Sequence, residues 1–172
     1  GNFNIGKFAF IENISPFSLA FLRWLLVWII LIPFTYKEIY SLKKIIFKNF
    51  KLLFLLGLSS VFLYSALTYK ALNYTQVINA SLFNTAVPAT IILVCFLLKI
   101  EKTNIFQLSG LLISTLGILA IVSKLQLNIL LSLDFNKGDL FMIIAIISWG
   151  VYSAFLKKRN FKISLLALVQ II

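Results

Sequence analysis

The chain has 172 residues, of which 61% are hydrophobic and only 12% are charged. A soluble domain carries about 25% charged residues, so this composition excludes a soluble domain and indicates an all-α integral membrane protein in a lipid bilayer. The net charge of +11 does not indicate nucleic-acid binding, because the basic residues cluster between apolar spans, where the positive-inside rule places them.

The first predicted span ends before Glu12 and already reads as mid-helix at Gly1, so we expect its start to be missing. It contains Asn2, Asn4 and Lys7. Asn4 and Lys7 are spaced i, i+3 and can share an interior face. Lys7 can equally extend to a membrane interface, and both interpretations remain open.

The second span is predicted from about Phe17 to Phe34. Ser15 is a plausible N-cap, and Pro16 suits the first helical position. Arg23 lies inside the span, where we expect it to reach the near interface or to pair with a carbonyl or carboxylate of the bundle. We treat Arg23 as a structural residue.

Residues 36–51 form a lysine-rich, amphipathic connection, which is typical of an interfacial helix on a cytoplasmic loop. The third span then runs from about Leu52 to Tyr69. Small and polar residues recur along one side of it and predict a close helix contact. They are Gly57, Ser60 or Val61, Tyr64 and Thr68.

The stretch 73–101 is uncharged from Gln76 to Leu98, long enough to cross a bilayer, and polar in its first half. Ser81, Asn84 and Pro88 share one helical face. Pro88 lacks an N–H and frees the carbonyl of residue 84. Polar groups at membrane depth are tolerated only against helices or a wet cavity. We therefore expect Asn84 to line a cavity, whereas Asn79 and Ser81 either line it or bond neighbouring helices.

The fifth span is predicted from about Ile105 to Ser123, with Gly110, Ser114 and Gly117 as a seam for helix packing. Residues 124–137 look interfacial. The sixth span opens at Gly138 and Asp139, where a carboxylate suits the helix dipole. In its second half, Trp149 and Tyr152 either wall a cavity or pack. A seventh span begins near Ser164 and is cut short.

Charge asymmetry predicts the topology. The loops after the even-numbered spans hold most of the 16 basic residues, which places loops 36–51, 99–104 and 157–162 in the cytoplasm. These basic residues are Lys37, Lys43, Lys44, Lys48, Lys51, Lys99, Lys102, Lys157, Lys158, Arg159 and Lys162.

The beginning and the end of the chain also correspond to each other at a fixed offset. The paired positions are Gly1 with Gly150, Phe3 with Tyr152, Ile14 with Ile163, Ser15 with Ser164 and Leu19 with Leu168. The turn after span one holds Glu12 without a base, whereas the turn after span six is basic. Spans one and six therefore cross in opposite directions if they are equivalent. A five-span unit that repeats must invert, which is typical of inverted-repeat transporters.

Catalytic groups are scarce. Histidine is absent, and the single cysteine, Cys95, lies in an apolar span. No acid lies inside a span, which leaves no paired carboxylates for catalysis or proton coupling. We therefore expect no enzyme activity, no catalytic residue, no metal site and no cofactor. The five acids are Glu12, Glu38, Glu101, Asp134 and Asp139.

Several segments resemble an EamA domain of the drug/metabolite transporter superfamily. GNFNIGKFAF with ISPFSLAFLRW resembles its first two helices, ALNYTQVINASLFNTAVPATIILVCFLLKIEK its fourth helix and turn, QLSGLLISTLGILAIVS its fifth, and GDLFMIIAIISWGVYSAFLKK its sixth. The usual Gly-Glu pair after helix four is replaced, because Lys99 and Ile100 precede Glu101. This departure bears on the shape of the turn.

The resemblance implies a ten-helix bundle of two inverted five-helix repeats, of which this chain is a fragment of six to seven helices. Residues 1–123 would be the first EamA repeat with a truncated first helix. Residues 124–137 would be an extracytoplasmic connection, and residues 138–172 the truncated start of the second repeat.

The resemblance also implies a secondary transporter that exports small metabolites such as amino acids across the bacterial inner membrane. The alternative is a lipid flippase or a small multidrug-type efflux subunit working as a homodimer. Nothing in the sequence selects a substrate. The residues expected to line the cavity are Asn2, Asn4, Lys7, Asn79, Ser81, Asn84, Trp149 and Tyr152, and those expected to pack helices are Arg23, Gly57, Pro88, Gly110, Ser114 and Gly117.

Overall fold

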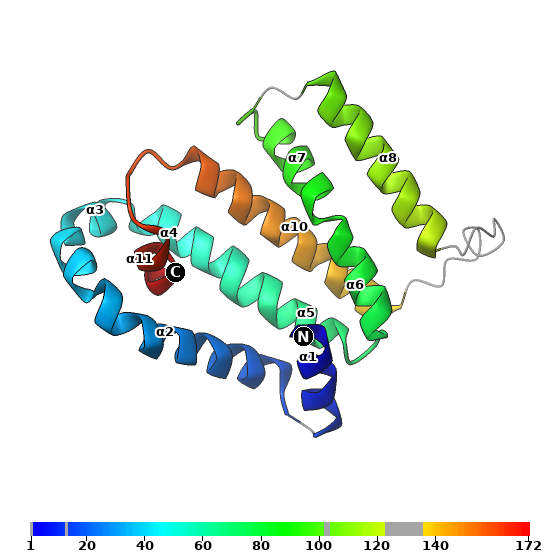
Figure 1. Cartoon of the computed structure of the whole chain (residues 1–172), viewed down its shortest axis with the longest axis horizontal. Helices are drawn as coiled ribbons and strands as arrows, with labels where there is room; N and C mark the ends of the chain where they lie inside the picture. Colours follow the sequence, from blue (N-terminus) through cyan, green and yellow to red (C-terminus); the bar gives the residue numbers. More distant parts are fainter. Residues whose placement is uncertain (1, 13, 102–103, 123–135) are drawn as a thin grey trace.

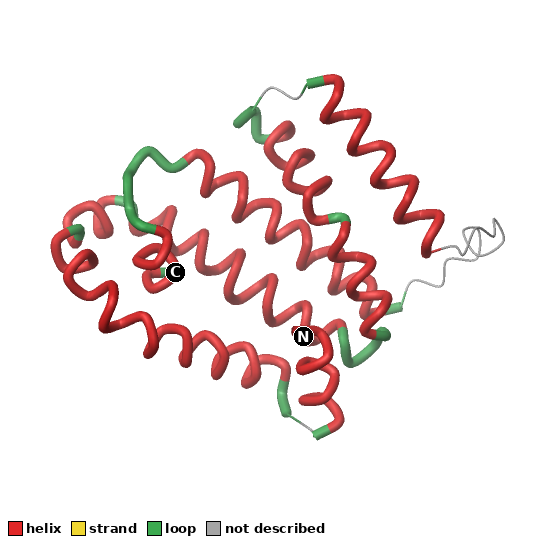
Figure 2. Tube along the Cα trace, in the orientation of Figure 1, coloured by secondary structure: helices red, strands yellow, loops and turns green. Residues whose placement is uncertain are grey.

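The computed structural model describes residues 2–12, 14–101, 104–122 and 136–172. Every regular element in these ranges is a helix, which confirms the all-α prediction (Figures 1 and 2). The elements are α1 (Asn2–Ile11), α2 (Pro16–Ser41), α3 (Lys43–Lys48), α4 (Phe50–Gly57), the π-helix η1 (Leu58–Ser65), α5 (Ala66–Ala71), α6 (Val77–Thr85), α7 (Val87–Leu97), α8 (Ile105–Val122), α10 (Lys137–Lys158) and α11 (Leu165–Ile171).

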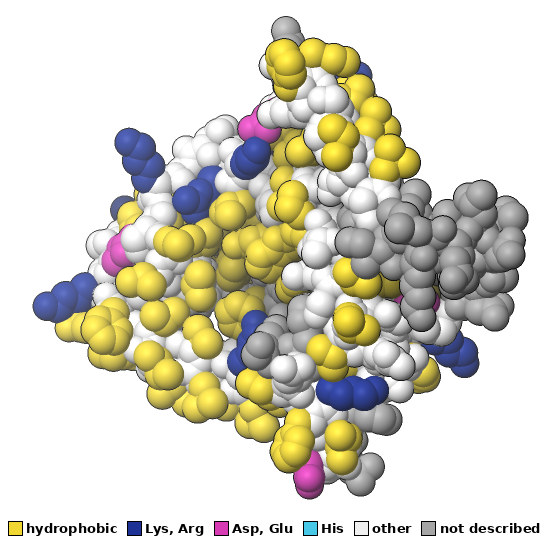
Figure 3. Space-filling view, turned by 45° about the vertical axis from the view of Figure 1, so that its right-hand side comes forward, with side chains coloured by type: hydrophobic (Ala, Val, Ile, Leu, Met, Phe, Trp, Pro, Cys, Tyr) yellow, Lys and Arg dark blue, Asp and Glu magenta, His cyan; other side chains and the backbone are white. Residues whose placement is uncertain are grey.

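Three of the described helical segments are long and apolar enough to cross a membrane: α2, the continuous run Phe50–Ala71 formed by α4, η1 and α5, and α10. The pair α6 and α7 gives a fourth span bent by 41°. Large apolar side chains such as Phe34 (74% exposed) and Phe106 (78% exposed) face outward, and hydrophobic side chains cover much of the face in Figure 3. The chain is a multi-pass membrane protein, because only lipid makes this surface favourable.

The second helix is longer than its apolar pattern predicts. The helix includes Pro33 and continues past Phe34 to Ser41. Residues beyond the apolar run, such as Lys37 and Glu38, are good helix formers and extend it. The lysine-rich connection is therefore helical almost throughout, as the end of α2, then α3, then the start of α4. The predicted interfacial segment at 124–137 lies almost wholly outside the described residues.

Helix α10 lies in the middle of the bundle, between the Phe50–Ala71 rod and the α6–α7 pair (Figure 1). A reciprocal capping box fixes its start, because Asn136 Oδ1 accepts from Asp139 N at 3.0 Å and Asp139 Oδ2 accepts from Asn136 N at 3.2 Å. Helix α10 contributes to all three apolar clusters: Met142 joins α2, α5 and α6, Tyr152 joins α4 and α11, and Ala154 joins α7.

A glycine brings α7 and α10 close together. A Cβ built on Gly150 would lie 3.1 Å from methyl groups of both Thr90 and Val94. Helix α11 packs mainly on α2 and starts at Ser164, whose Oγ accepts from Ala167 N at 3.2 Å. Ser15 is the N-cap residue of α2 with Pro16 next to it, but its side chain makes no capping hydrogen bond.

Candidate functional site

An aromatic and amide cluster joins three helices close to the middle of their spans. Its members are Tyr64 from η1, Asn84 from α6, and Trp149 and Tyr152 from α10. The Tyr64 hydroxyl donates to Asn84 Oδ1 at 2.9 Å. The Trp149 ring contacts Tyr64 at 4.6 Å and Tyr152 at 5.0 Å between ring centroids. We call these four residues the aromatic–amide cluster.

The position of Asn84 depends on a break in its span. Helix α6 ends at Thr85 and α7 starts at Val87, with Pro88 in the first turn of α7. Proline lacks an N–H and its ring excludes a regular turn before it, so the two helices meet at 41°. The break places the Asn84 amide in the last turn of α6, facing Tyr64. The sequence predicted only a carbonyl freed by Pro88 within one continuous span, and the structure shows a break and a bend.

Tyr64 is positioned by the π-helix η1, which the sequence analysis did not predict. Serine hydroxyls bond back to carbonyls of the same helix here, from Ser59 to Leu55 O at 2.7 Å and from Ser60 to Leu56 O at 2.7 Å. Such bonding weakens the regular ladder, and π-turns are frequent at functional sites. The serines of this segment, Ser59, Ser60 and Ser65, are the sequence signal that could have indicated it.

A second polar network ties α2 to the same rod. Arg23 Nη1 donates to the Tyr69 hydroxyl at 2.8 Å, and its guanidinium lies 5.2 Å from the centre of the Trp24 ring. Trp24 Nε1 donates to Ser65 Oγ at 3.2 Å. Because Ser65 follows Tyr64 directly, the two networks share one stretch of backbone. Arg23 thus holds α2 against α5. The sequence predicted a carbonyl or carboxylate partner, or a place at the near interface, whereas this hydrogen bond is made to a phenol hydroxyl.

Lys7 lies at the opposite end of α5 from η1. Its Nζ donates to Leu72 O at 2.8 Å and lies 3.4 Å from Thr75 O. These carbonyls follow the last turn of α5, where a cation is favoured by the helix dipole. Lys7 therefore bonds the turn between α5 and α6 at one end of the bundle and does not join the aromatic–amide cluster.

The remaining predicted cavity residues are not brought together. Asn4 and Asn79 are exposed on their helices. The Ser81 hydroxyl donates to Val77 O at 2.8 Å within its own helix. The side chain of Asn2 lies outside the described part of the chain.

The predicted packing glycines differ in their surroundings. A Cβ on Gly57 would meet the carbonyl oxygen of Ile172 at 2.5 Å, so this residue lets α11 approach closely. On α8, a Cβ on Gly110 or on Gly117 would meet no described atom within 4 Å. Ser114 is exposed on the same helix, so the described residues do not cover the predicted α8 seam.

The aromatic–amide cluster has few groups for covalent chemistry. Among the described residues, no group of three His, Cys, Asp or Glu side chains could hold a metal ion. Cys95 is free and buried. The cluster offers an amide, two phenol hydroxyls and an indole, which hydrogen-bond and stack without forming covalent bonds. This inventory suits recognition of a small molecule.

Comparison with known proteins adds the family. A family model described as the EamA-like transporter family matches residues 2–123. An "Uncharacterized transporter" of Archaeoglobus fulgidus is 35% identical over 162 residues, covering 91% of this chain and 54% of the relative. The chain thus spans about half the length of this curated relative. No solved structure matches the chain.

Proposed function

The chain belongs to the EamA-like transporter family, and we propose on that premise that it is part of a secondary transporter that exports small metabolites such as amino acids. The aromatic–amide cluster is the proposed substrate site. The observation that carries this assignment is the Tyr64–Asn84 hydrogen bond, which joins two spans where both depart from regular α-helix.

Irregular helices near the middle of a membrane are a recurrent feature of transporter sites. Backbone and polar side chains at that depth are stable only where they meet protein or line a cavity. Asn84 and Tyr64 meet this condition through each other, and Trp149 supplies an aromatic face beside them. A substrate with an apolar or aromatic body and a polar end would find both kinds of contact here.

The second-repeat proposal has structural support. Ser15 and Ser164, which correspond in the sequence, are the N-cap residues of α2 and α11. Glu38 near the end of α2 bonds Ser164 at the start of α11. Helix α11 therefore starts on the side where α2 ends, as an inverted equivalent should. The relative's greater length is consistent with a second repeat that this chain begins.

Counterflow in proteoliposomes tests the function. The full-length protein would be reconstituted and preloaded with a panel of amino acids and small metabolites, with protein-free vesicles as the control. Saturable, substrate-selective exchange is expected and would name the substrate class. Absence of exchange with every panel member, from well-folded protein, would contradict the metabolite-exporter proposal and favour a lipid flippase or a dimeric small multidrug-type subunit.

A further inference from the structure

The two acidic residues on the lysine-rich side of the bundle both contact residues that are distant in the sequence. Glu38 and Glu101 lie among most of the 16 basic residues, so each carboxylate has lysines of its own segment nearby. Each carboxylate nevertheless bonds a residue beyond position 136, Ser164 in one case and Lys157 in the other. The family model covers both acids but neither of their partners.

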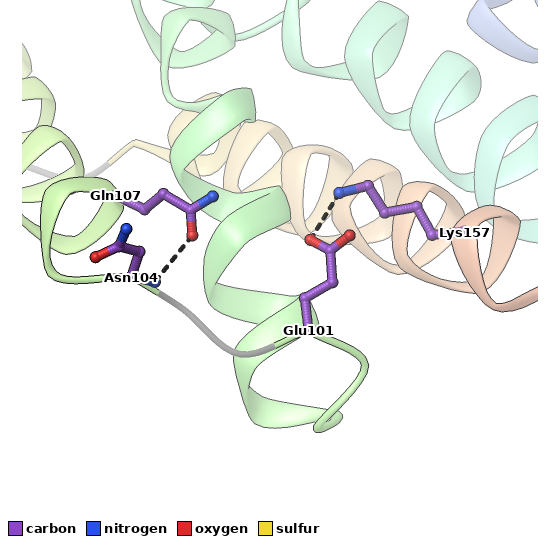
Figure 4. Close-up of polar contacts among 4 residues, drawn as sticks. All are labelled: Glu101, Asn104, Gln107 and Lys157. Atoms are coloured by element: carbon purple, nitrogen blue, oxygen red, sulfur yellow. Dashed lines mark hydrogen bonds and ion pairs between the residues drawn. The ribbon is translucent and has the colours of Figure 1, made fainter.

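The first contact is an ion pair between the turn after α7 and the end of α10. Lys157 Nζ lies 2.8 Å from Glu101 Oε2, as Figure 4 shows. The preceding turn has a left-handed residue, Lys99 (φ 52°), and Ile100 N donates to Cys95 O at 2.9 Å. This closes α7 as a Schellman-type cap and brings Glu101 next to α10.

The second contact joins the end of α2 to the start of α11. Glu38 Oε1 accepts from Ser164 N at 2.9 Å, and Glu38 Oε2 accepts from Ser164 Oγ at 2.6 Å. A carboxylate is favoured at a helix N-terminus by the unpaired N–H groups there. We call the Glu101–Lys157 and Glu38–Ser164 pairs the gate contacts.

The gate contacts lie at the lysine-rich end of the bundle, on one side of the aromatic–amide cluster. Lys157 is eight residues from Trp149 on α10, a separation of about 12 Å along a helix. Below the ion pair, Cys95 (3% exposed) packs with Val94 against Ala154 of α10. The side chains of Lys157 and Glu101 are 48% and 50% exposed. Water competes for such pairs, so they can break and re-form easily.

We propose that the gate contacts form the cytoplasmic gate of the substrate site, closed in this structure and opened when α2 and α7 separate from α11 and α10. The proposal rests on the proposed transport function. Both acids link the segment matched by the family model to the segment that follows it. A gate accounts for these two links, whereas a surface that does not move would not need them.

Cys95 reports directly on the first contact, because separation of α7 from α10 would expose it. The experiment uses the full-length protein with Cys95 as its one reactive thiol and a membrane-impermeant maleimide as the alkylating reagent. Lys157→Gln is expected to raise the rate of Cys95 alkylation about two- to fivefold, because this is the effect of losing an exposed ion pair. Lys158→Gln, at an exposed neighbour with no ion pair in the described residues, should leave the rate unchanged.

Charge reversal separates gating from misfolding. The double variant Glu101→Lys with Lys157→Glu re-creates the pair and is expected to restore the slow alkylation of Cys95. An unchanged rate in Lys157→Gln, or a failure of the reversed pair to slow the reaction, would overturn the gate.

The second contact is tested with its own reporter. Ala167 is fully buried on α11, so Ala167→Cys in a Cys95→Ser background reports on the α11 side. Glu38→Gln is expected to speed its alkylation, whereas Lys37→Gln, one residue away, should not. Equal rates in Glu38→Gln and its parent would remove the Glu38–Ser164 pair from the gate.

Cross-linking connects the gate to transport. The variant for this test carries Glu101→Cys and Lys157→Cys in the Cys95→Ser background. A short bifunctional thiol reagent would bridge the two new cysteines, and counterflow would then be measured. Exchange should fall at least tenfold and return on reductive release of the bridge. Undiminished exchange in the bridged protein would overturn the gate. Absence of exchange before bridging would count against the transport function, and the alkylation rates would still decide the gate.

Discussion

The Tyr64 hydroxyl donates a hydrogen bond to Asn84 Oδ1 across 2.9 Å, and it joins a π-helix to the last turn before a proline-induced break. Both partners are half-buried, at a depth where an unpaired polar group is costly. The hydrogen bond therefore holds η1 against α6.

Asn84→Leu is expected to abolish transport without lowering the amount of folded protein. Leucine has the same number of side-chain heavy atoms and the same branching as asparagine, and the lost hydrogen bond costs about 1 kcal/mol. Tyr64→Phe removes the same bond from the other side and should slow exchange about two- to tenfold. The measurement is counterflow alongside the yield of monodisperse protein. Ser81→Ala, whose hydroxyl bonds its own helix, is the control, and normal transport by Asn84→Leu would remove Asn84 from the site.

Lys99→Gly is expected to stabilise the protein by about 1 kcal/mol. Lys99 has a φ of 52°, a left-handed conformation that disfavours any residue with a Cβ and suits glycine. Thermal unfolding of the purified protein measures the change. Lys99→Ala removes the same charge and keeps the Cβ, so it should give no comparable gain. An equal gain from alanine would attribute the effect to charge and not to backbone conformation.

Gly150→Ala is expected to destabilise the bundle by about 1–2 kcal/mol. The added methyl would lie 3.1 Å from Thr90 and Val94, and an overpacked interface must shift. Gly110→Ala is the matched control, because no described atom lies within 4 Å of its Cβ position and alanine favours a helix by up to about 1 kcal/mol. Equal melting temperatures for the two variants would show that α7 and α10 tolerate the methyl.

A cysteine placed at Lys44 is expected to react with an impermeant thiol reagent only from the cytoplasmic side. Lys44 is exposed on α3, within the most basic connection of the chain, and the positive-inside rule places that connection in the cytoplasm. The experiment compares labelling in right-side-out and inverted vesicles, in a Cys95→Ser background. Reaction from outside would reverse the predicted topology and place the gate contacts on the opposite side.

The sequence predicted the class of protein and much of the helical frame. Long uncharged runs bounded by lysine clusters are stable as membrane helices. The helix start predicted at Gly138 and Asp139 lies one residue from the observed start of α10 at Lys137, because a carboxylate suits a helix N-terminus. Periodicity also predicted one shared face for Ser81, Asn84 and Pro88, on a helix that the structure breaks between Asn84 and Pro88. These signals are local, so one chain segment is enough to reveal them.

Only the tertiary structure placed the partners. Tyr64 was one member of a predicted seam, and its bond to Asn84 depends on a π-helix whose turn departs from the 3.6-residue period used to read sequence. Ser81 and Asn84 look alike in sequence, yet one bonds its own helix and the other bonds across the bundle. The contact of Glu38 with Ser164 spans 126 positions. Composition and period determine which segments become helices, but which side chains meet depends on how those helices pack, and packing is a property of the whole bundle.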